Sequence, residues 1–88
     1  MQIMELISEV KPDEMMLQRW LIDRVAESIK VKPDDIDTTL PFSYYGLDSV
    51  AAIGLSGDLE ILLGTKLSPT LTWDYPTIEL LAAYLAKE

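Results

Sequence analysis

The sequence predicts an all-α domain, most simply a bundle of three main helices and a short fourth one. Apolar residues recur at helical spacing in several segments, no segment alternates with period two for long enough to form a strand, and prolines or glycines separate the segments. With 88 residues, 49% of them hydrophobic, the chain has room for one domain and one core. We place the domain at residues 13–88 and expect residues 1–12 to form a linker or a short extra helix.

The first main helix is predicted at about residues 14–30, and Pro33 is expected to end it. The connection that follows, residues 31–48, is long for so small a domain, so we expect it to fold back onto the core. The apolar stripe of the helix consists of Leu17, Leu21, Val25 and Ile29, and the anchors expected in the long loop are Ile36, Leu40 and Phe42.

The second main helix is predicted at residues 49–63, because Asp48 suits an N-cap and Gly64 suits a C-terminal stop. A second apolar side lies opposite the expected core face, and a domain this small cannot enclose a helix on all sides, so we interpret that side as a docking surface. The expected core face is Ala52, Leu55, Leu59 and Leu62, and the expected docking surface is Val50, Ile53, Gly57 and Ile61.

The short helix is predicted from Ser68-Pro69 to about Trp73, because proline suits the first helical position. Thr77 is expected to cap the last helix. Trp20 and Trp73 allow two interpretations, a ligand-stacking surface or ordinary packing, and packing is favoured for side chains of this size. The apolar residues that recur in the last helix are Ile78, Leu81, Ala82 and Leu85.

Composition narrows the possible functions. The net charge of −8 disfavours nucleic acid and anionic membranes as partners and favours proteins with basic patches. No apolar run approaches the length of a membrane span, so we expect no membrane partner. The absence of cysteine excludes disulfides and thiolate metal sites and agrees with the cytoplasmic location that we expect.

A serine at a predicted helix start is the main candidate for chemistry. Gly46 allows a tight turn and Asp48 ends it, which leaves the hydroxyl of Ser49 exposed where backbone N–H groups favour a phosphate-bearing group. A catalytic serine needs a base, and the chain has no histidine. We therefore predict that another enzyme modifies Ser49, and that the chain is not an enzyme and has neither catalytic residues nor a metal site. The alternative is a helical protein-interaction module in which Ser49 is only a capping residue.

Four stretches, in order and at the expected spacing, resemble a known family. Residues 41–50 resemble the attachment-site region of acyl carrier proteins. Residues 31–37, 67–71 and 75–78 resemble the corresponding stretches of carrier domains in modular, type I polyketide synthases. The resemblance implies a bundle of the acyl-carrier type with a long first loop.

The resemblance also implies the roles of individual residues. Ser49 matches the serine that carries a covalent 4′-phosphopantetheine cofactor, whose thiol holds acyl intermediates as thioesters. Asp48 matches the aspartate that assists the magnesium-dependent transferase complex, and Leu47 and Val50 match the residues that flank the arm. The sequence Gly-Leu-Asp-Ser favours an acyl carrier over a peptidyl carrier.

The resemblance names partners as well. It implies a phosphopantetheinyl transferase, and ketosynthase, acyltransferase or acyl-AMP ligase domains that contact Val50, Ile53, Gly57 and Ile61. We expect polyketide or related fatty acid chemistry, and a monomer when the domain is isolated.

Overall fold

The computed structural model describes residues 13–87, which are helical throughout apart from their connections. This confirms the predicted all-α class with a long first loop. The prediction for residues 1–12 lies outside the described residues. The main helices are α2 (Glu14–Ile29), α3 (Ser49–Leu63) and α5 (Ile78–Lys87), the short helix is α4 (Leu71–Asp74), and the long loop contains two turns of 3-10 helix, η1 (Pro33–Asp35) and η2 (Phe42–Tyr45).

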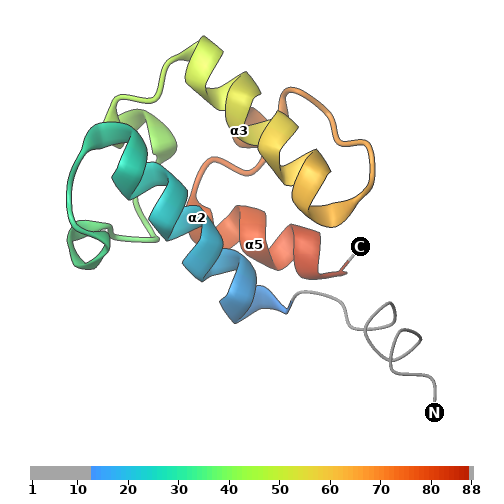
Figure 1. Cartoon of the computed structure of the whole chain (residues 1–88), viewed down its shortest axis with the longest axis horizontal. Helices are drawn as coiled ribbons and strands as arrows, with labels where there is room; N and C mark the ends of the chain where they lie inside the picture. The colour runs from blue at the N-terminus through green and yellow to red at the C-terminus, as the bar shows by residue number, and fades with distance from the viewer. Residues whose placement is uncertain (1–12, 88) are drawn as a thin grey trace.

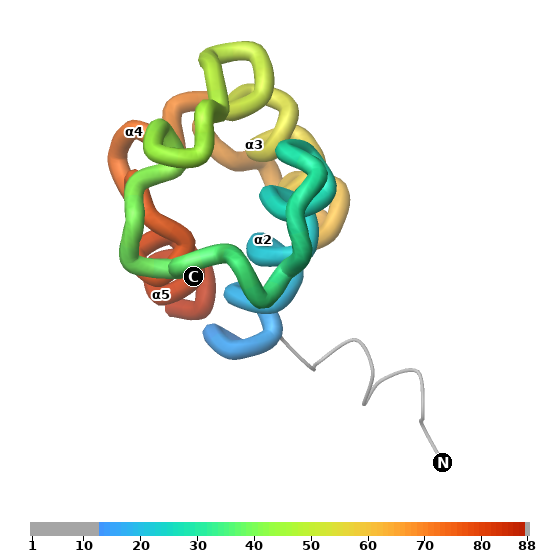
Figure 2. The backbone as a smooth tube through the Cα atoms, turned by 90° about the vertical axis from the view of Figure 1, so that its left-hand side faces the viewer, coloured from blue at the N-terminus to red at the C-terminus, as the bar shows by residue number. Residues whose placement is uncertain are grey.

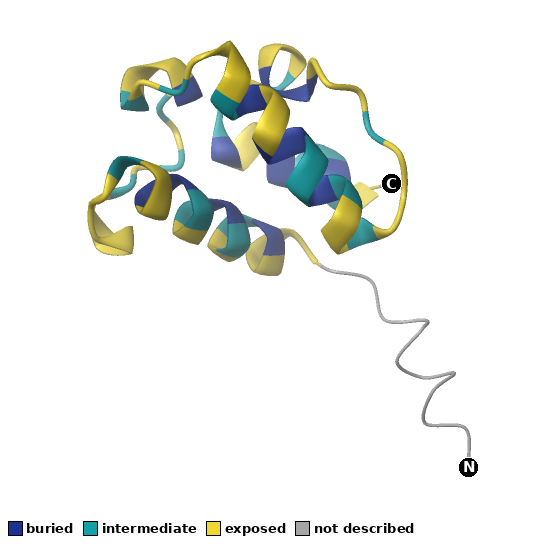
Figure 3. Cartoon of the chain, turned by 45° about the horizontal axis from the view of Figure 1, so that its top comes forward, coloured by how far each residue is buried: buried dark blue, intermediate teal, exposed yellow. Residues whose placement is uncertain are grey.

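The helices surround one common core. α2 packs most extensively against α5, and the two lie next to each other below α3 in Figure 1. Viewed from the end, the helices and the long loop form a closed ring (Figure 2). Buried residues lie on the inward sides of the helices, whereas α3 also carries exposed residues near both of its ends (Figure 3).

The core is apolar and contains most of the predicted residues. Each fully buried aliphatic side chain contributes about 1.5–3 kcal/mol relative to an exposed one. Ile29, predicted in the stripe of the first helix, is only half-buried and packs at the edge of the core. The core comprises Leu17, Leu21, Val25, Phe42, Leu55, Leu59, Leu71, Ile78, Leu81, Ala82 and Leu85.

Local capping decides where α2 begins and ends. The Met16 N–H donates to the Asp13 carboxylate at 2.8 Å. At the other end Lys30 adopts a left-handed conformation with φ 62°, and its N–H donates to the carbonyl of Ala26. The prediction that Pro33 ends this helix was therefore wrong: the chain turns at Lys30, and Pro33 instead begins η1.

The start of α4 differs from the prediction, whereas the start of α5 agrees with it. The short helix begins at Leu71 and not at Ser68-Pro69, because the Ser68 hydroxyl accepts the Thr70 N–H at 3.1 Å and forms a separate turn first. Thr77 caps α5 as predicted, since its Oγ1 accepts the Leu80 N–H at 3.0 Å.

The long loop is fastened to the core and to the start of α5. Phe42 is buried and Ile36 packs against the core, whereas Leu40 is half-buried and lies outside the core cluster. The only β-type pairing in residues 13–87 is an isolated bridge between Pro41 and Thr77. Within the same residues, no helix is long and apolar enough to cross a membrane.

Candidate functional site

The predicted attachment residue, Ser49, is the first residue of α3 and is exposed. Asp48 caps this helix, because its Oδ1 accepts the Ala51 N–H at 2.9 Å and its carbonyl accepts the Ala52 N–H at 2.9 Å. Helix geometry leaves the N–H groups of Ser49 and Val50 without an intrahelical acceptor. The positive end of the helix dipole therefore lies beside the Ser49 hydroxyl and favours a negatively charged substituent there.

A tight turn places Asp48 and Ser49 at the surface. Gly46 ends η2 in the left-handed region, with φ 79°, where a side chain would be strained. Its N–H donates to the carbonyl of Ser43 at 3.0 Å. Leu47 follows and points back into the domain, half-buried against the core. The turn thus packs Leu47 partly against the core and leaves Ser49 exposed.

Two contacts beyond the turn hold it in place. The Tyr45 hydroxyl accepts the Asp37 N–H and lies 3.2 Å from the Asp37 carbonyl, so one side chain ties η2 to the middle of the long loop. The Phe42 N–H donates to the Pro76 carbonyl at 2.8 Å, which ties η2 to the start of α5. Neither contact was predicted, because no local sequence pattern indicates which distant residue a turn will meet.

A cavity of about 350 Å³ adjoins Ser49 and is called the serine cavity below. It lies between η2, the start of α3 and α4. Its walls are mainly apolar, and Ser49 is one of the residues that line it. The lining residues that matter for the site are Pro41, Phe42, Leu47, Ser49, Trp73 and Pro76.

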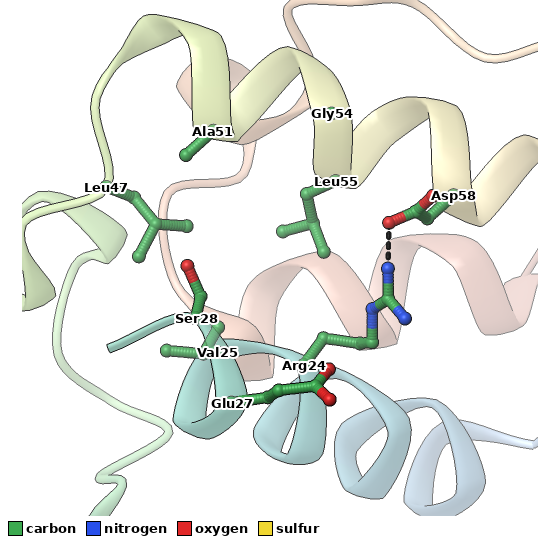
Figure 4. A pocket seen from close by; sticks show the side chains of 9 residues that line it. All are labelled: Arg24, Val25, Glu27, Ser28, Leu47, Ala51, Gly54, Leu55 and Asp58. Atoms are coloured by element: carbon green, nitrogen blue, oxygen red, sulfur yellow. Dashed lines mark hydrogen bonds and ion pairs between the residues drawn. The ribbon is translucent and has the colours of Figure 1, made fainter. Parts of the chain in front are cut away.

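A second cavity, of about 220 Å³, lies between α2 and α3 and is called the interhelix cavity below. Figure 4 shows Val25 of α2 and Leu55 of α3 facing each other across it, with Leu47 at one end. An ion pair between Arg24 and Asp58 bridges the two helices beside it. Leu47 lines both cavities and therefore separates them, while Ser49 lines only the serine cavity.

The hydroxyl of Ser49 has no base of its own. The chain contains no histidine, and no group among residues 13–87 hydrogen-bonds to the hydroxyl. The nearby carboxylate of Asp48 is turned toward the helix N–H groups, which it caps. Among the described residues, the Ser49 hydroxyl is therefore accessible and lacks the neighbouring base that activates a catalytic serine.

Electrostatics in the long loop follow from local hydrogen bonds. The Thr39 hydroxyl and backbone N–H both donate to Asp37 Oδ1, at 2.6 and 2.9 Å. These two bonds, the hydroxyl bond more than the backbone bond, hold the pKa of Asp37 below its ordinary value. The carboxylate is exposed, so the effect is confined to the loop.

The predicted docking residues lie on the exposed side of α3. Val50 is 79% and Ile61 is 83% exposed, and Ile53 is also exposed. Between them Gly57 is half-buried, and a Cβ added there would meet nothing within 4 Å. The helix therefore carries three exposed apolar side chains, with an open stretch at Gly57 between Ile53 and Ile61.

One residue of the predicted core face was placed wrongly. Ala52, Leu55 and Leu59 are buried as predicted, but Leu62 is 43% exposed. On a helical wheel Leu62 and Ser56 lie about 60° to either side of Leu59, and Ser56 is the buried one. The side of α3 that carries Leu62 faces α2 across the interhelix cavity, where close packing is absent.

Comparison with protein families identifies the domain. The profile of the family described as "Phosphopantetheine attachment site" matches residues 19–85, a range that includes Ser49. One of the phenolphthiocerol/phthiocerol polyketide synthase subunits from Mycobacterium tuberculosis is 45% identical over 73 residues, which are 83% of this chain and 4% of that protein. The 6-methylsalicylic acid synthase of Aspergillus terreus is 32% identical over 74 residues, 78% of this chain and 4% of the synthase. The chain thus spans a small fraction of these synthases.

Solved structures agree with the predicted fold. A free-standing peptidyl carrier protein from Acinetobacter baumannii aligns with a TM-score of 0.82 and 44% identity, covering 88% of this chain and 96% of that one. An acyl carrier protein from Anabaena sp. PCC 7120, which has a variant phosphopantetheinylation-site sequence, aligns with a TM-score of 0.81 and 43% identity, covering 89% and 90% of the two chains. The chain is therefore a non-catalytic carrier that belongs to the phosphopantetheine-attachment family, related both to polyketide synthase carrier domains and to free-standing carrier proteins.

Proposed function

We propose that Ser49 is the residue that carries 4′-phosphopantetheine. The observation that supports this assignment is its exposed hydroxyl at the capped start of α3, beside a cavity, within a family defined by this attachment. The residues fit the group: the helix N-terminus favours its phosphate, and the serine cavity is at the small end of the range of about 300–1,000 Å³ that ligand sites occupy. The bound group supplies a thiol that holds an acyl chain as a thioester.

The direct test is intact mass after incubation with coenzyme A, magnesium and a broad-specificity phosphopantetheinyl transferase. The parent protein is expected to gain the mass of one arm, and Ser49→Ala to gain none while keeping its helical circular dichroism. Ser43→Ala is the matched control, because Ser43 is an exposed serine in the neighbouring η2 turn. A mass gain that persists in Ser49→Ala would overturn the assignment.

We further propose that the chain delivers acyl intermediates in polyketide assembly, in the cytoplasm, where coenzyme A is available to the transferase. The 45% identity to a polyketide synthase supports this pathway class. Its partners are the transferase and ketosynthase, acyltransferase or acyl-AMP ligase domains. They contact the docking surface of α3, which is formed by Val50, Ile53, Gly57 and Ile61.

The open stretch on α3 supports contact by shape. A glycine inside a helix costs about 0.5–1 kcal/mol relative to alanine. No neighbouring residue in the described chain makes glycine necessary at position 54 or 57. A Cβ added at either glycine would meet nothing within 4 Å. A partner that approaches α3 closely between Ile53 and Ile61 accounts for Gly57, whereas Gly54 lines the interhelix cavity.

A second candidate is delivery of aminoacyl or peptidyl groups. The 44% identity to a free-standing peptidyl carrier protein favours it, although the Gly-Leu-Asp-Ser sequence favours an acyl carrier. Mass spectrometry of the arm released from protein purified from its native host would distinguish them, because an amino acid adds nitrogen to the thioester and a polyketide acyl chain adds none.

A further inference from the structure

A third cavity, of about 540 Å³, lies at the other end of α3 from Ser49 and is called the end cavity below. A helix of 15 residues is about 21 Å long, so the end cavity is well separated from the serine. It is larger than the serine cavity and the interhelix cavity. Its walls include Leu63, Lys66, Leu67, Tyr75, Tyr84 and Leu85.

The apolar walls of the end cavity are firmly held but incompletely covered. Leu67, Tyr75 and Tyr84 pack against the core, yet each is only half-buried. The rings of Tyr75 and Tyr84 stack, with centroids 4.1 Å apart and planes 16° from parallel. The Leu67 N–H donates to the Glu60 carboxylate at 2.7 Å, which fixes the connection that carries Leu67 to α3. The cavity is therefore a formed apolar surface, and covering it removes that surface from water.

Residues 1–12, which lie outside the described residues, contain an apolar stripe that requires a partner surface. Its members recur at the spacing i, i+3, i+4 and i+7, which is typical of one side of a helix. So short a segment does not maintain such a pattern in water without packing. Pro12 disfavours the helical conformation at Lys11, so the stripe is separate from that of α2. The stripe consists of Ile3, Leu6, Ile7 and Val10.

The start of α2 lies at the same end of the molecule as the end cavity. Figures 1 and 3 both show the first turn of α2, the connection after α3 and the end of α5 on one side. Leu17 of α2 and Leu85 of α5 belong to one core cluster, and Leu85 also lines the cavity. Twelve residues span at most about 40 Å, so a segment attached to Asp13 reaches the cavity. Attachment to the same chain also gives the segment a high effective concentration there.

We propose that the apolar stripe of residues 1–12 packs into the end cavity. The volumes agree, because about 150 Å³ holds a molecule of the size of benzene and about 540 Å³ therefore holds about three such groups. Leu6, Ile7 and Val10, the stripe residues nearest to α2, supply three side chains of that order. The half-buried rings of Tyr75 and Tyr84 form the surface on which these side chains lie.

This contact fastens the segment away from the proposed attachment residue. A segment held at the end of α3 leaves Ser49 and the docking surface of α3 free for partners. The inference goes beyond the proposed function and does not depend on modification of Ser49. Intact mass after incubation with the transferase tests the attachment separately in each variant below, so the two proposals fail independently.

The first test locates the segment with a spin label. The chain has no cysteine, so Ser8→Cys provides a single labelling site next to the stripe. The label is expected to broaden the amide signals of Leu67 and Ala86 in the full chain and to leave that of Val50 sharp, because Val50 lies at the far end of α3. Adding Leu6→Asp and Ile7→Asp is expected to abolish the broadening. Absence of broadening, or its persistence in the stripe variant, would overturn the inference.

A mixed sample distinguishes the segment of the same chain from that of a second copy. Spin-labelled protein without ¹⁵N is combined with unlabelled, ¹⁵N-enriched protein, so only contacts between copies broaden the signals. No broadening is expected in this sample. Broadening of Leu67 and Ala86 here would assign the cavity to a second copy and contradict packing within one chain.

The second test measures the stabilising effect of the contact. The Leu6→Asp/Ile7→Asp variant is expected to unfold at a temperature lower by roughly 4–8 °C, because the stripe no longer covers the end cavity. Met4→Asp/Ser8→Asp is the matched control, since it adds the same charge on the other side of the helical pattern and is expected to unfold near the parent temperature. Equal unfolding temperatures of the two variants would overturn the inference.

Discussion

The α2–α5 pair and the helix α3 use their apolar residues differently. In the pair, apolar residues such as Leu21 and Leu81 are fully buried, and the helices pack closely along their length. α3 buries one side through Leu59 but leaves Val50 and Ile61 in solvent, and a cavity beside an ion pair lies between it and α2. The difference indicates that stability resides mainly in the pair and that α3 gives up packing in order to present the site.

The largest expected effect is a difference in stability between substitutions on the buried side and on the exposed side of α3. Leu59→Ala is expected to lower the free energy of unfolding by about 2–5 kcal/mol, because it leaves a cavity at a fully buried position. Ile53→Asp is expected to change stability by about 0.5 kcal/mol or less but to slow acyl transfer by partner domains. Urea denaturation and transfer assays on both variants measure the difference. If Ile53→Asp destabilises as much as Leu59→Ala, α3 does not have a free docking side.

The next effect concerns the cap of α3. Asp48→Ala removes the acceptor for the Ala51 N–H and is expected to cost about 0.5–2 kcal/mol. Asp48→Asn keeps that acceptor and is expected to preserve stability while slowing modification by the transferase, which the family resemblance links to the carboxylate. Thermal unfolding and modification rates test the pair. If the transferase modifies Asp48→Asn as fast as the parent protein, the role of Asp48 is limited to capping the helix.

Gly57→Ala is expected to stabilise the isolated domain by about 0.5–1 kcal/mol, because alanine is the better helix former and the added Cβ has open space. The same change is expected to slow transfer to partner domains, since it fills the open stretch on α3. Gly64→Ala is the control with opposite sign: Gly64 has φ 69°, so alanine there is strained and destabilising. Faster transfer by Gly57→Ala would contradict close approach of a partner at this position.

The smallest effect lies in the long loop and depends on pH. Because hydrogen bonds from Thr39 lower the pKa of Asp37, the ionised form stabilises the folded state above the ordinary carboxyl pKa. That contribution is lost as the pH falls through the lowered pKa, in the acid range below about pH 4. Thr39→Val is expected to raise the pKa of Asp37 in an NMR titration, while Thr39→Ser, which keeps the hydroxyl, preserves it. Equal titration of the two variants would assign the shift to another cause.

Local chemistry made α3 predictable from the sequence. Asp48 and Gly64 bracket the helix with capping preferences that act over a few residues, so both ends were predicted correctly. Thr77 likewise marked the start of α5. Features that depend on distant partners were not predictable: the ion pair of Arg24 with Asp58 joins residues 34 apart, and the exposure of Leu62 depends on where α2 passes.

The candidate site shows the same division between local and distant features. The serine, its cap and the predicted docking residues are close in sequence, so helical periodicity placed them on a common helix, with Val50, Ile53 and Ile61 exposed as expected and Gly57 half-buried. The serine cavity brings Trp73 of α4 to the start of α3, although a whole helix and a loop separate the two in sequence. Periodicity within one helix contains no information about that approach, so the position of Trp73 beside the serine emerged only from the fold.

The packing of α2 on α5 has a consequence for how the protein is made. α2 is the first described helix and α5 the last, so the core cannot close on a nascent chain until both of these helices have left the ribosome. The turn before Ser49 is fastened to Pro76 and Thr77, which are translated well after it. A serine that is already outside the ribosome therefore lacks its folded surroundings until α5 emerges. If Ser49 carries the arm as proposed, synthesis thus delays the time at which the chain becomes a substrate for the transferase.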